Sequence, residues 1–316
     1  MATYKEIHGV KVQYRDSDAT VIEGDVWYNA STGLLKMYAA EGSWSSGGNL
    51  NTARGYGCAA GTQTAGLCIG GIDGPQKDEV ESYDGSSWTE IADINTARGN
   101  SGSGGTQTAA IIFGGQAPDA ETEIWNGTSW TEVGDLNTAR KTQGNGTTTS
   151  AIAYGGGPPG VANVETWNGS SWTETTDINT LRYYGTGVGT GNDNAMMIGG
   201  QTHAPAYIAV CEIWNGTAWT EVADLNTGRS TLGGAGTTTA AVAYGGGSPG
   251  KDETEIWNGT AWTEVNDMTT ARYGVTRNDT GSQTAALCSG GTLNPGWVQT
   301  TEEWSFAAAI ETVAFD

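Results

Sequence analysis

Short apolar runs alternate with polar turns along most of the chain. An apolar run that ends in Gly-Gly, such as residues 109–113, precedes a Glu-x-Trp stretch and then a Trp-Thr-Glu stretch. Apolar runs of about four to eight residues bounded by Gly, Asn and Asp are typical of β-strands, and Asn-Gly between two of them indicates a hairpin. No stretch of the sequence has a helical period with caps. We therefore expect an all-β chain.

Four landmarks recur together and define an internal repeat. In each copy a Trp is followed ten residues later by an Arg, then by a Gly pair, and then by the Glu of a Glu-x-Trp or Glu-x-Tyr stretch. Successive arginines are 42 to 47 residues apart. The arginines are Arg54, Arg98, Arg140, Arg182, Arg229 and Arg272, and the glutamates are Glu81, Glu123, Glu165, Glu212, Glu255 and Glu302. Six copies share one register.

Each copy predicts four short strands, named A to D in chain order. Strand A follows the Arg (residues 55–61 in the first copy) and is rich in Gly, strand B is the apolar run, strand C carries the Glu, and strand D begins at the Trp. A repeat of this length with four strands is typical of a β-propeller blade, in which Gly allows the crowded innermost strands to approach closely. We predict an all-β fold, a six-bladed β-propeller of four-stranded blades over residues 42–306.

Closure of such a ring needs a strand shared between the two ends of the repeat region. The sixth copy supplies strands A to C and lacks strand D. Residues 42–45 precede the first copy in the D register and are the favoured donor. The alternative is residues 310–313, which also have strand character. With the first choice, residues 307–316 form a C-terminal strand or tail that adds beside the ring or pairs with a neighbour.

Residues 1–41 lie outside the repeat. Two apolar stretches, 24–29 and 34–38, flank a polar turn and predict a small β-hairpin. An isolated two-stranded hairpin is barely stable in water, so it must pack on the propeller or on a partner. We expect residues 1–41 to be an attachment segment. Its docking side chains are expected to be Trp27, Tyr28, Leu35 and Tyr38.

The repeat resembles the kelch family of β-propellers. The Gly pair after strand B, the aromatic residue of strand C and the spaced Trp of strand D carry this resemblance over roughly residues 43–306. Kelch repeats more often have Tyr in strand C and a His early in strand A. The near-identical copies, with Asn-Thr-Ala-Arg and Asn-Gly-Thr-Ser-Trp, look like kelch-like proteins of tailed bacteriophages, especially marine ones. The Gly-Asp-x-Trp-Tyr-Asn stretch of residues 24–29 is similar to N-terminal segments of phage virion and tail-fibre proteins.

Charge and composition exclude several partners. The chain has 316 residues with 14 Lys and Arg against 35 Asp and Glu, a net charge of −21. This charge disfavours nucleic acid and anionic membrane surfaces. No run approaches the roughly 20 apolar residues of a membrane helix. The four cysteines have no Cys-x-x-Cys spacing, and no disulfide is required. Cys68 and Cys288 lie in apolar runs and are expected to be small core residues.

Catalytic residues are scarce. Only His8 and His203 are available as histidine bases or ligands, and neither lies beside a nucleophile motif. The six arginines permit a cluster that grips a carboxylate, as in sialidases, but each copy carries its Arg in the same place, which favours a structural role. Glu123 shares a strand face with Trp125, so such a Glu is a candidate partner of the Arg. We expect no catalytic residue, cofactor or metal.

The loops between strands B and C differ most among the copies. Because successive strands of a blade run antiparallel, these loops share one face with the Asn-Thr-Ala-Arg segments. Variable loops on a rigid scaffold are the usual place for recognition, although drift in exposed loops explains the variation equally well. Aromatic and cationic side chains there suit a glycan or a protein loop. The candidate binding residues are Lys77, His203, Tyr207, Lys251 and Trp297.

These features predict a non-enzymatic structural virion protein of a tailed phage, made in the host cytoplasm. It is expected to be a tail, fibre or capsid-associated adhesion module. Its expected partners are other virion proteins through residues 1–41, a host surface glycan or protein through the B–C loops, and further copies of itself in the particle. The alternative is a glycan-acting enzyme, sialidase-like or a depolymerase. A cellular interaction scaffold is a third, more weakly supported class.

Overall fold

The computed structural model describes residues 12–17, 26–116, 120–202, 206–277, 281–293 and 296–312. Every regular element within these residues is a β-strand, and none of them is helical, so the all-β class is confirmed. The chain divides into two compact units, one made of Met1–Ser43 and Phe306–Asp316 and the other of Trp44–Ser305.

The described strands form five four-stranded antiparallel sheets and one six-stranded sheet. In chain order, the first four-stranded sheet consists of β4 (Cys58–Thr62), β5 (Ala65–Ile72), β6 (Gln76–Tyr83) and β7 (Trp88–Glu90), and the second of β8 (Gly102–Thr106), β9 (Ala109–Phe113), β10 (Thr122–Trp125) and β11 (Trp130–Glu132). The third consists of β12 (Gln143–Thr147), β13 (Ser150–Tyr154), β14 (Val164–Trp167) and β15 (Trp172–Thr175), and the fourth of β16 (Thr186–Gly191), β17 (Asn194–Ile198), β18 (Cys211–Trp214) and β19 (Trp219–Val222). The fifth consists of β20 (Gly233–Thr237), β21 (Ala240–Tyr244), β22 (Thr254–Trp257) and β23 (Trp262–Val265). The six-stranded sheet has the order β1 (Gln13–Arg15), β2 (Val26–Asn29), β3 (Leu34–Ser46), β26 (Thr301–Thr312), β25 (Ala285–Ser289) and β24 (Gly281–Ser282).

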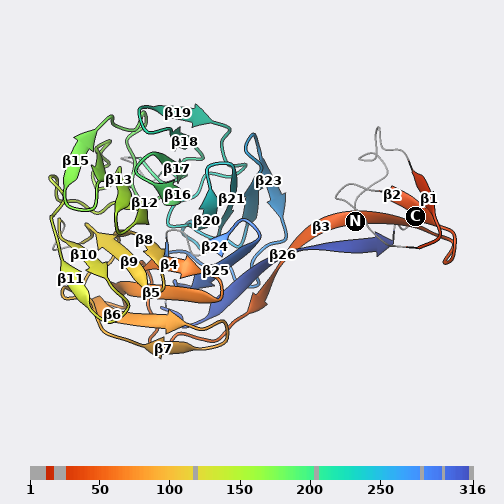
Figure 1. Cartoon of the computed structure of the whole chain (residues 1–316), viewed down its shortest axis with the longest axis horizontal. Helices are drawn as coiled ribbons and strands as arrows, with labels where there is room; N and C mark the ends of the chain where they lie inside the picture. Colours follow the sequence, from red (N-terminus) through yellow and green to blue (C-terminus); the bar gives the residue numbers. More distant parts are fainter. Residues whose placement is uncertain are drawn as a thin grey trace. The chain divides into compact units, whose positions relative to one another are not determined.

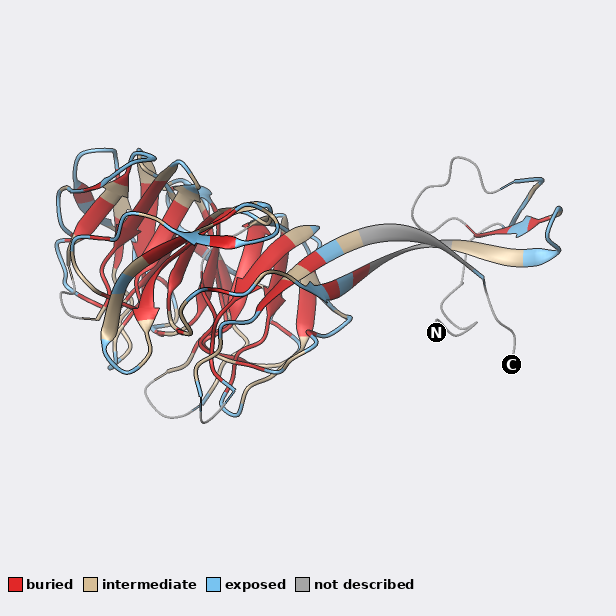
Figure 2. Cartoon of the chain, turned by 90° about the horizontal axis from the view of Figure 1, so that it is seen from below, coloured by how far each residue is buried: buried red, intermediate tan, exposed pale blue. Residues whose placement is uncertain are grey.

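The sheets of residues 44–305 follow one another in chain order about a common centre (Figure 1). Their first strands contact one another: β4 contacts β8, β8 contacts β12, β12 contacts β16, and β16 contacts β20. Successive antiparallel sheets that meet through their first strands make a propeller-like arrangement. Within this unit the strands are mostly buried and the connecting turns mostly exposed (Figure 2).

Strand B of the second copy spans the predicted residues, since β9 is Ala109–Phe113. Strand A of the first copy begins later than predicted, because β4 starts at Cys58 and not at Gly55. The reason is the backbone of Tyr56, whose φ of 55° lies in the left-handed region and interrupts extended pairing before Cys58. Gly55 nevertheless exchanges two backbone hydrogen bonds with Ile72, of 3.0 and 2.8 Å.

The N-terminal hairpin joins β2 to β3, with Val26 opposite Met37 and Asn29 opposite Leu34. The Asn29 side chain accepts the N–H groups of the turn residues 31 and 32 at 3.0 and 3.1 Å, which fixes the turn. β1 adds to β2 in parallel. β3 extends to Ser46 and is the neighbour of β26 in the sheet. Residues 44–46 therefore lie next to β26, in the outer position that we expected residues 42–45 to occupy.

Residues 310–312, the alternative donor of the outer strand, belong to β26 itself. Residue 313 lies outside the described residues. Phe306 and the following residues of β26, up to Thr312, group with the N-terminal unit.

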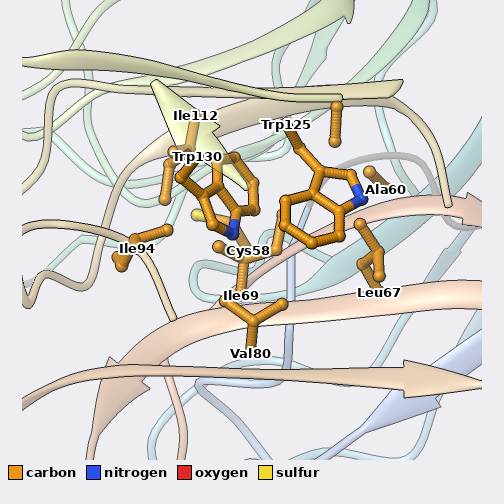
Figure 3. Close-up of a cluster of buried hydrophobic side chains, with 10 residues drawn as sticks. Cys58, Ala60, Leu67, Ile69, Val80, Ile94, Ile112, Trp125 and Trp130 are labelled. Carbon is orange, nitrogen blue, oxygen red and sulfur yellow. The ribbon is translucent and has the colours of Figure 1, made fainter. Parts of the chain in front are cut away.

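Neighbouring sheets pack through shared hydrophobic clusters. One such cluster combines Cys58, Ile69 and Val80 of the β4–β7 sheet with Ile112 and Trp130 of the β8–β11 sheet (Figure 3). Ile94, from the segment that links the two sheets, completes the contact. The strand-D Trp therefore serves the interface between sheets as well as its own sheet.

Candidate functional site

The six repeat arginines and six repeat glutamates form buried ion pairs. Both side chains of every pair are 5% exposed or less. In the first copy Arg54 Nη1 donates to Glu81 Oε1 at 2.7 Å. The others are Arg98–Glu123, Arg140–Glu165 at 2.5 Å, Arg182–Glu212 at 2.6 Å, Arg229–Glu255 at 2.8 Å and Arg272–Glu302 at 2.5 Å. The Glu is thus the partner of the Arg, as the shared strand face suggested.

The Asn of each Asn-Thr-x-Arg segment completes the coordination of the carboxylate. Glu81 Oε2 accepts the backbone N–H of Asn51 at 2.7 Å and its side-chain N–H at 2.8 Å, and Oε1 accepts the N–H of Thr52 at 3.3 Å. Asn95, Asn137, Asn179 and Asn226 repeat this pattern in the next four copies. The sequence reasoning missed this role, although the Asn lies three residues before the Arg in each of these copies.

Thr269 replaces the Asn in the sixth copy. Its N–H and its hydroxyl both donate to Glu302 Oε2, at 2.7 and 2.5 Å. The hydroxyl therefore substitutes for the amide, and the carboxylate keeps two donors from this position. A charged acceptor with several short hydrogen bonds is well stabilised despite its burial.

The linking segment is also bonded to the preceding sheet. Between the β4–β7 and β8–β11 sheets, Ile91 and Ile94 donate their N–H groups to Val80 and Asp78 at 2.9 and 3.1 Å. Arg98 donates its N–H to Lys77 at 3.0 Å, while its side chain reaches Glu123 of the next sheet. Each Arg–Glu pair therefore helps to hold two neighbouring sheets in register.

Burial is the main influence on the pKa of three of these guanidinium groups. It lowers the pKa of Arg98, Arg182 and Arg229, and the paired glutamate opposes that effect in each case. An arginine remains protonated at neutral pH even with such a shift. The buried guanidinium groups are thus enclosed scaffold cations, and none of the six is placed to grip an external carboxylate.

The candidate binding residues are held by local contacts. Lys77 pairs with Asp73 at 3.0 Å and with Glu79 at 3.3 Å, and Lys251 pairs with Glu253 at 2.6 Å. The Tyr207 hydroxyl donates to Ser248 O at 3.2 Å, and the Trp297 ring meets the edge of Tyr56 at a centroid distance of 5.9 Å.

Of these four candidates, Lys77 lies near the start of β6, and the other three lie in the B–C connections of three other sheets. Within the described ranges no hydrogen bond, ion pair or ring contact joins them to one another. His203 lies outside the described residues, as do His8 and the positions of three prolines in the same loops. The structure therefore does not assemble the candidates into one compact site.

The expected docking residues of the N-terminal segment differ in accessibility. Trp27 is fully buried, with the Arg15 guanidinium 5.4 Å from its ring, so the expectation that its indole contacts a partner is wrong for this conformation. A large ring among short strands is instead the core residue of its unit. Tyr28 is exposed and stacks on Tyr14, and Leu35 is half-buried. The Tyr38 side chain lies outside the described residues.

All four cysteines are buried and unpaired with one another. Burial raises the pKa of every thiol, to about 12 for Cys211 and about 11 for Cys288. A neutral buried thiol behaves as a small apolar side chain. The prediction that Cys68 and Cys288 are core residues is confirmed.

Among the shallow cavities lined by described residues of the unit 44–305, three have volumes of about 300 Å³ or more. Two of them, of about 310 and 360 Å³, share Gly281 and Ser282 and are otherwise lined by A–B turn residues such as Gln63 and Thr237. The third, of about 310 Å³, lies between Lys141 and the loop of residues 157–161. None of the three gathers a set of acidic residues that would resemble a glycosidase site.

Across the described ranges, no three His, Cys, Asp or Glu side chains lie close enough to hold a metal ion. Among the same residues no helix has the length and hydropathy needed to cross a membrane. A comparison with protein-family models found no matching family. A search of curated proteins found no relative.

Proposed function

We propose that the chain is a non-enzymatic adhesion module of a tailed-phage virion, built on a closed six-bladed kelch-like β-propeller. The proposal of an adhesion function rests on a difference between the two units in where charged and apolar side chains lie. The six buried Arg–Glu pairs of residues 44–305 hold sheets together, whereas exposed large apolar side chains concentrate in the N-terminal unit. Such exposed apolar residues mark an attachment surface more often than a catalytic one.

Backbone hydrogen bonds about the common centre support a closed ring. In five of the six copies, the residue two positions after the repeat Arg donates its N–H to the equivalent residue of the preceding copy, and the first copy donates to the last. These bonds are Asn100 to Tyr56 at 2.9 Å, Thr142 to Asn100 at 3.3 Å, Thr231 to Tyr184 at 2.6 Å, Gly274 to Thr231 at 3.0 Å and Tyr56 to Gly274 at 2.7 Å. Four of these six positions are non-Gly residues with φ between 55° and 59°.

Contacts between the first and last copies support closure as well. β24 contacts both β20 and β4, and Ala59 and Arg277 are joined by an N–H to O=C bond of 3.0 Å. Further out, the indole N–H of Trp44 reaches Thr254 at 2.9 Å, and that of Trp88 reaches Thr301 at 3.0 Å. A ring with these contacts has six blades, and residues 44–46 supply the outer strand of the last one.

The N-terminal unit supports attachment to a particle. Val12, Tyr14, Tyr28 and Leu34 are 54%, 74%, 37% and 42% exposed, against only two other large apolar residues of comparable exposure in the described chain. This surface would contact a neighbouring virion protein, and the face of the B–C loops would contact a host surface glycan or protein. The resemblance of residues 24–29 to phage virion segments provides the phage assignment.

Incorporation into particles tests the attachment. Tyr14→Ser is expected to reduce incorporation of the chain into virions strongly, while Leu293→Ser, at an exposed apolar residue of the other unit, leaves it unchanged. Equal incorporation of both variants, or an N-terminal segment without any virion contact in a particle reconstruction, would overturn the attachment. Shortening of host polysaccharide by the purified chain would instead establish the glycan-acting enzyme.

A further inference from the structure

Arg277 is a buried cation outside the repeat pattern. It lies five residues after Arg272, where the first, second and third copies have Ala59, Ser103 and Asn145. Its side chain is 1% exposed, and its backbone is bonded to Gly57 and Ala59 beside β4. A change of this kind in one copy of a near-identical series breaks the symmetry at the centre of the sheets.

The surroundings of Arg277 come from three other sheets. Its Nη2 donates to Asn100 Oδ1 at 2.6 Å, and its guanidinium carbon lies 5.9 Å from the centre of the Tyr56 ring and 5.7 Å from that of Tyr184. The two rings and the amide hold the guanidinium in place, but none of them carries a negative charge. Burial lowers the pKa of Arg277, which reflects the cost of enclosing this charge.

No carboxylate pairs with Arg277 in the part of the chain that the structure describes. Its Nε and Nη1 both lack a hydrogen-bond partner. The Nε atoms of five repeat arginines also lack one, but each of those guanidinium groups is neutralised by its Glu. Among the buried arginines that the structure describes, Arg277 is therefore the one without a counter-charge. A buried charge is costly unless it is paired.

Other unpartnered polar groups occur on the first strands of two nearby sheets. Gln143 has neither amide atom bonded, Asn145 has a free side-chain N–H group, and Thr186 has a free hydroxyl. All three residues are buried, on β12 or at the start of β16. The centre of the sheets is thus polar and positively charged, although the chain as a whole carries −21.

We infer that the centre of the propeller-like unit binds one small oxyanion, with Arg277 as the principal donor. The unused N–H groups of the guanidinium provide charge-assisted hydrogen bonds to anionic oxygens, and Asn100, Tyr56 and Tyr184 position the guanidinium. Sulfate, inorganic phosphate and the carboxylate of a small sugar acid share this chemistry. The site does not depend on the proposed phage function.

Thermal unfolding of the full chain at constant ionic strength tests the site, with chloride replaced by sulfate, phosphate, glucuronate or, as a neutral control, glucose. A ligand that binds only the folded state raises the melting temperature. Sulfate or phosphate is expected to raise the melting temperature of the wild type by several degrees. Glucuronate raises it as well if the site also accepts sugar acids. Arg277→Met is expected to abolish the rise, and Lys36→Met, which removes a partly exposed cation of the N-terminal unit, preserves it.

In chloride, Arg277→Met is expected to melt above the wild type, because it removes a buried charge without a counter-charge. No anion-dependent rise in the wild type, or the same rise in Arg277→Met, would overturn the site. If Arg277→Met fails to fold, calorimetric titration of the wild type and of Arg277→Lys with sulfate decides. One sulfate bound per wild-type chain, with at least tenfold weaker binding to Arg277→Lys, supports the site, and no heat of binding contradicts it.

Discussion

The Arg182 guanidinium donates to the Glu212 carboxylate at 2.6 Å, and both side chains are fully buried. Breaking a buried pair from one side leaves an unpaired charge, which costs about 3–5 kcal/mol. Arg182→Met is therefore expected to lower the free energy of unfolding by about this amount, and Glu212→Leu to do the same. The double variant is expected to recover most of the loss. Urea unfolding measures all three.

The partly exposed pair Lys251–Glu253 provides the control, since its separation is 2.6 Å but its side chains are 32% and 26% accessible. Exposed pairs contribute about 0–1 kcal/mol, so Lys251→Met should be nearly neutral. A loss in Arg182→Met no larger than that in Lys251→Met would contradict the structural role of the buried pairs.

Asn137 donates its side-chain N–H to Glu165 at 2.8 Å and to Trp172 O at 3.0 Å. Asn137→Ala removes these donors from a buried carboxylate and is expected to cost about 1–2 kcal/mol of unfolding free energy. Thr138→Ala is the matched control, because Thr138 contributes only its backbone N–H to the same carboxylate. Equal urea midpoints for the two variants would show that the Asn amide is dispensable.

Gly104 of β8 lies close against Gly146 of β12. A Cβ atom on it would stand 2.3 Å from Gly146 O, whereas a Cβ on Gly296 would meet no atom within 4 Å. Gly104→Ala is expected to destabilise the fold by at least about 1–3 kcal/mol, as overpacking does, and Gly296→Ala to be neutral. Melting temperatures check both. Tolerance of Gly104→Ala would contradict the tight central packing of the first strands.

The four cysteines should be unreactive in the folded chain. Burial raises the pKa of Cys211 to about 12 and that of Cys288 to about 11, so neither is a thiolate at pH 8. We expect no thiol to react with a disulfide reagent such as DTNB at pH 8 within minutes, and all four to react in denaturant. Prompt release of one or more equivalents from the native protein would contradict this burial.

Stability should fall at alkaline pH. Burial raises the pKa of Cys211 from 9.0 to about 12 and the pKa of Tyr56 from 10.0 to about 12. The unfolded chain therefore releases these protons at lower pH than the folded chain. The unfolding free energy is therefore expected to be constant with respect to these groups below about pH 9 and to decrease from there to about pH 12. Urea midpoints at several pH values measure this decrease. Tyr56→Phe removes one group and should flatten the decrease, and a profile that it leaves unchanged would exclude a Tyr56 contribution.

The repeat was sufficient to predict the strands because Trp, Arg, Gly pairs and Glu recur at fixed spacing. The order of strands within a copy follows from the order of these landmarks. The pairing of Arg98 with Glu123 follows from the alternation of side chains along a strand and from the cost of burying an unpaired charge. The start of strand A could not be predicted, because it depends on a left-handed Tyr56, a conformation that sequence pattern does not favour for Tyr. The role of Asn51 was hidden because Asn in a linker is also an ordinary turn residue.

The roles of the residues at the centre of the sheets were harder to predict from the sequence. Arg277 has no recurring neighbour and belongs to no motif, and only the meeting of several sheets encloses it beside Tyr56 and Tyr184. Similarly, Trp27 is an aromatic residue in an attachment-like segment, yet it fills the interior of its unit. Burial of this kind depends on packing between segments that are distant in sequence.

An experimental density map of the isolated chain tests the central claim most directly. The account predicts six four-stranded sheets in a closed ring, with Trp44 bonded to Thr254, Trp88 bonded to Thr301, and residues 44–46 beside residues 301–305 as the outer strand. A map with five or seven sheets, or with an open gap between β4 and β24, would contradict it.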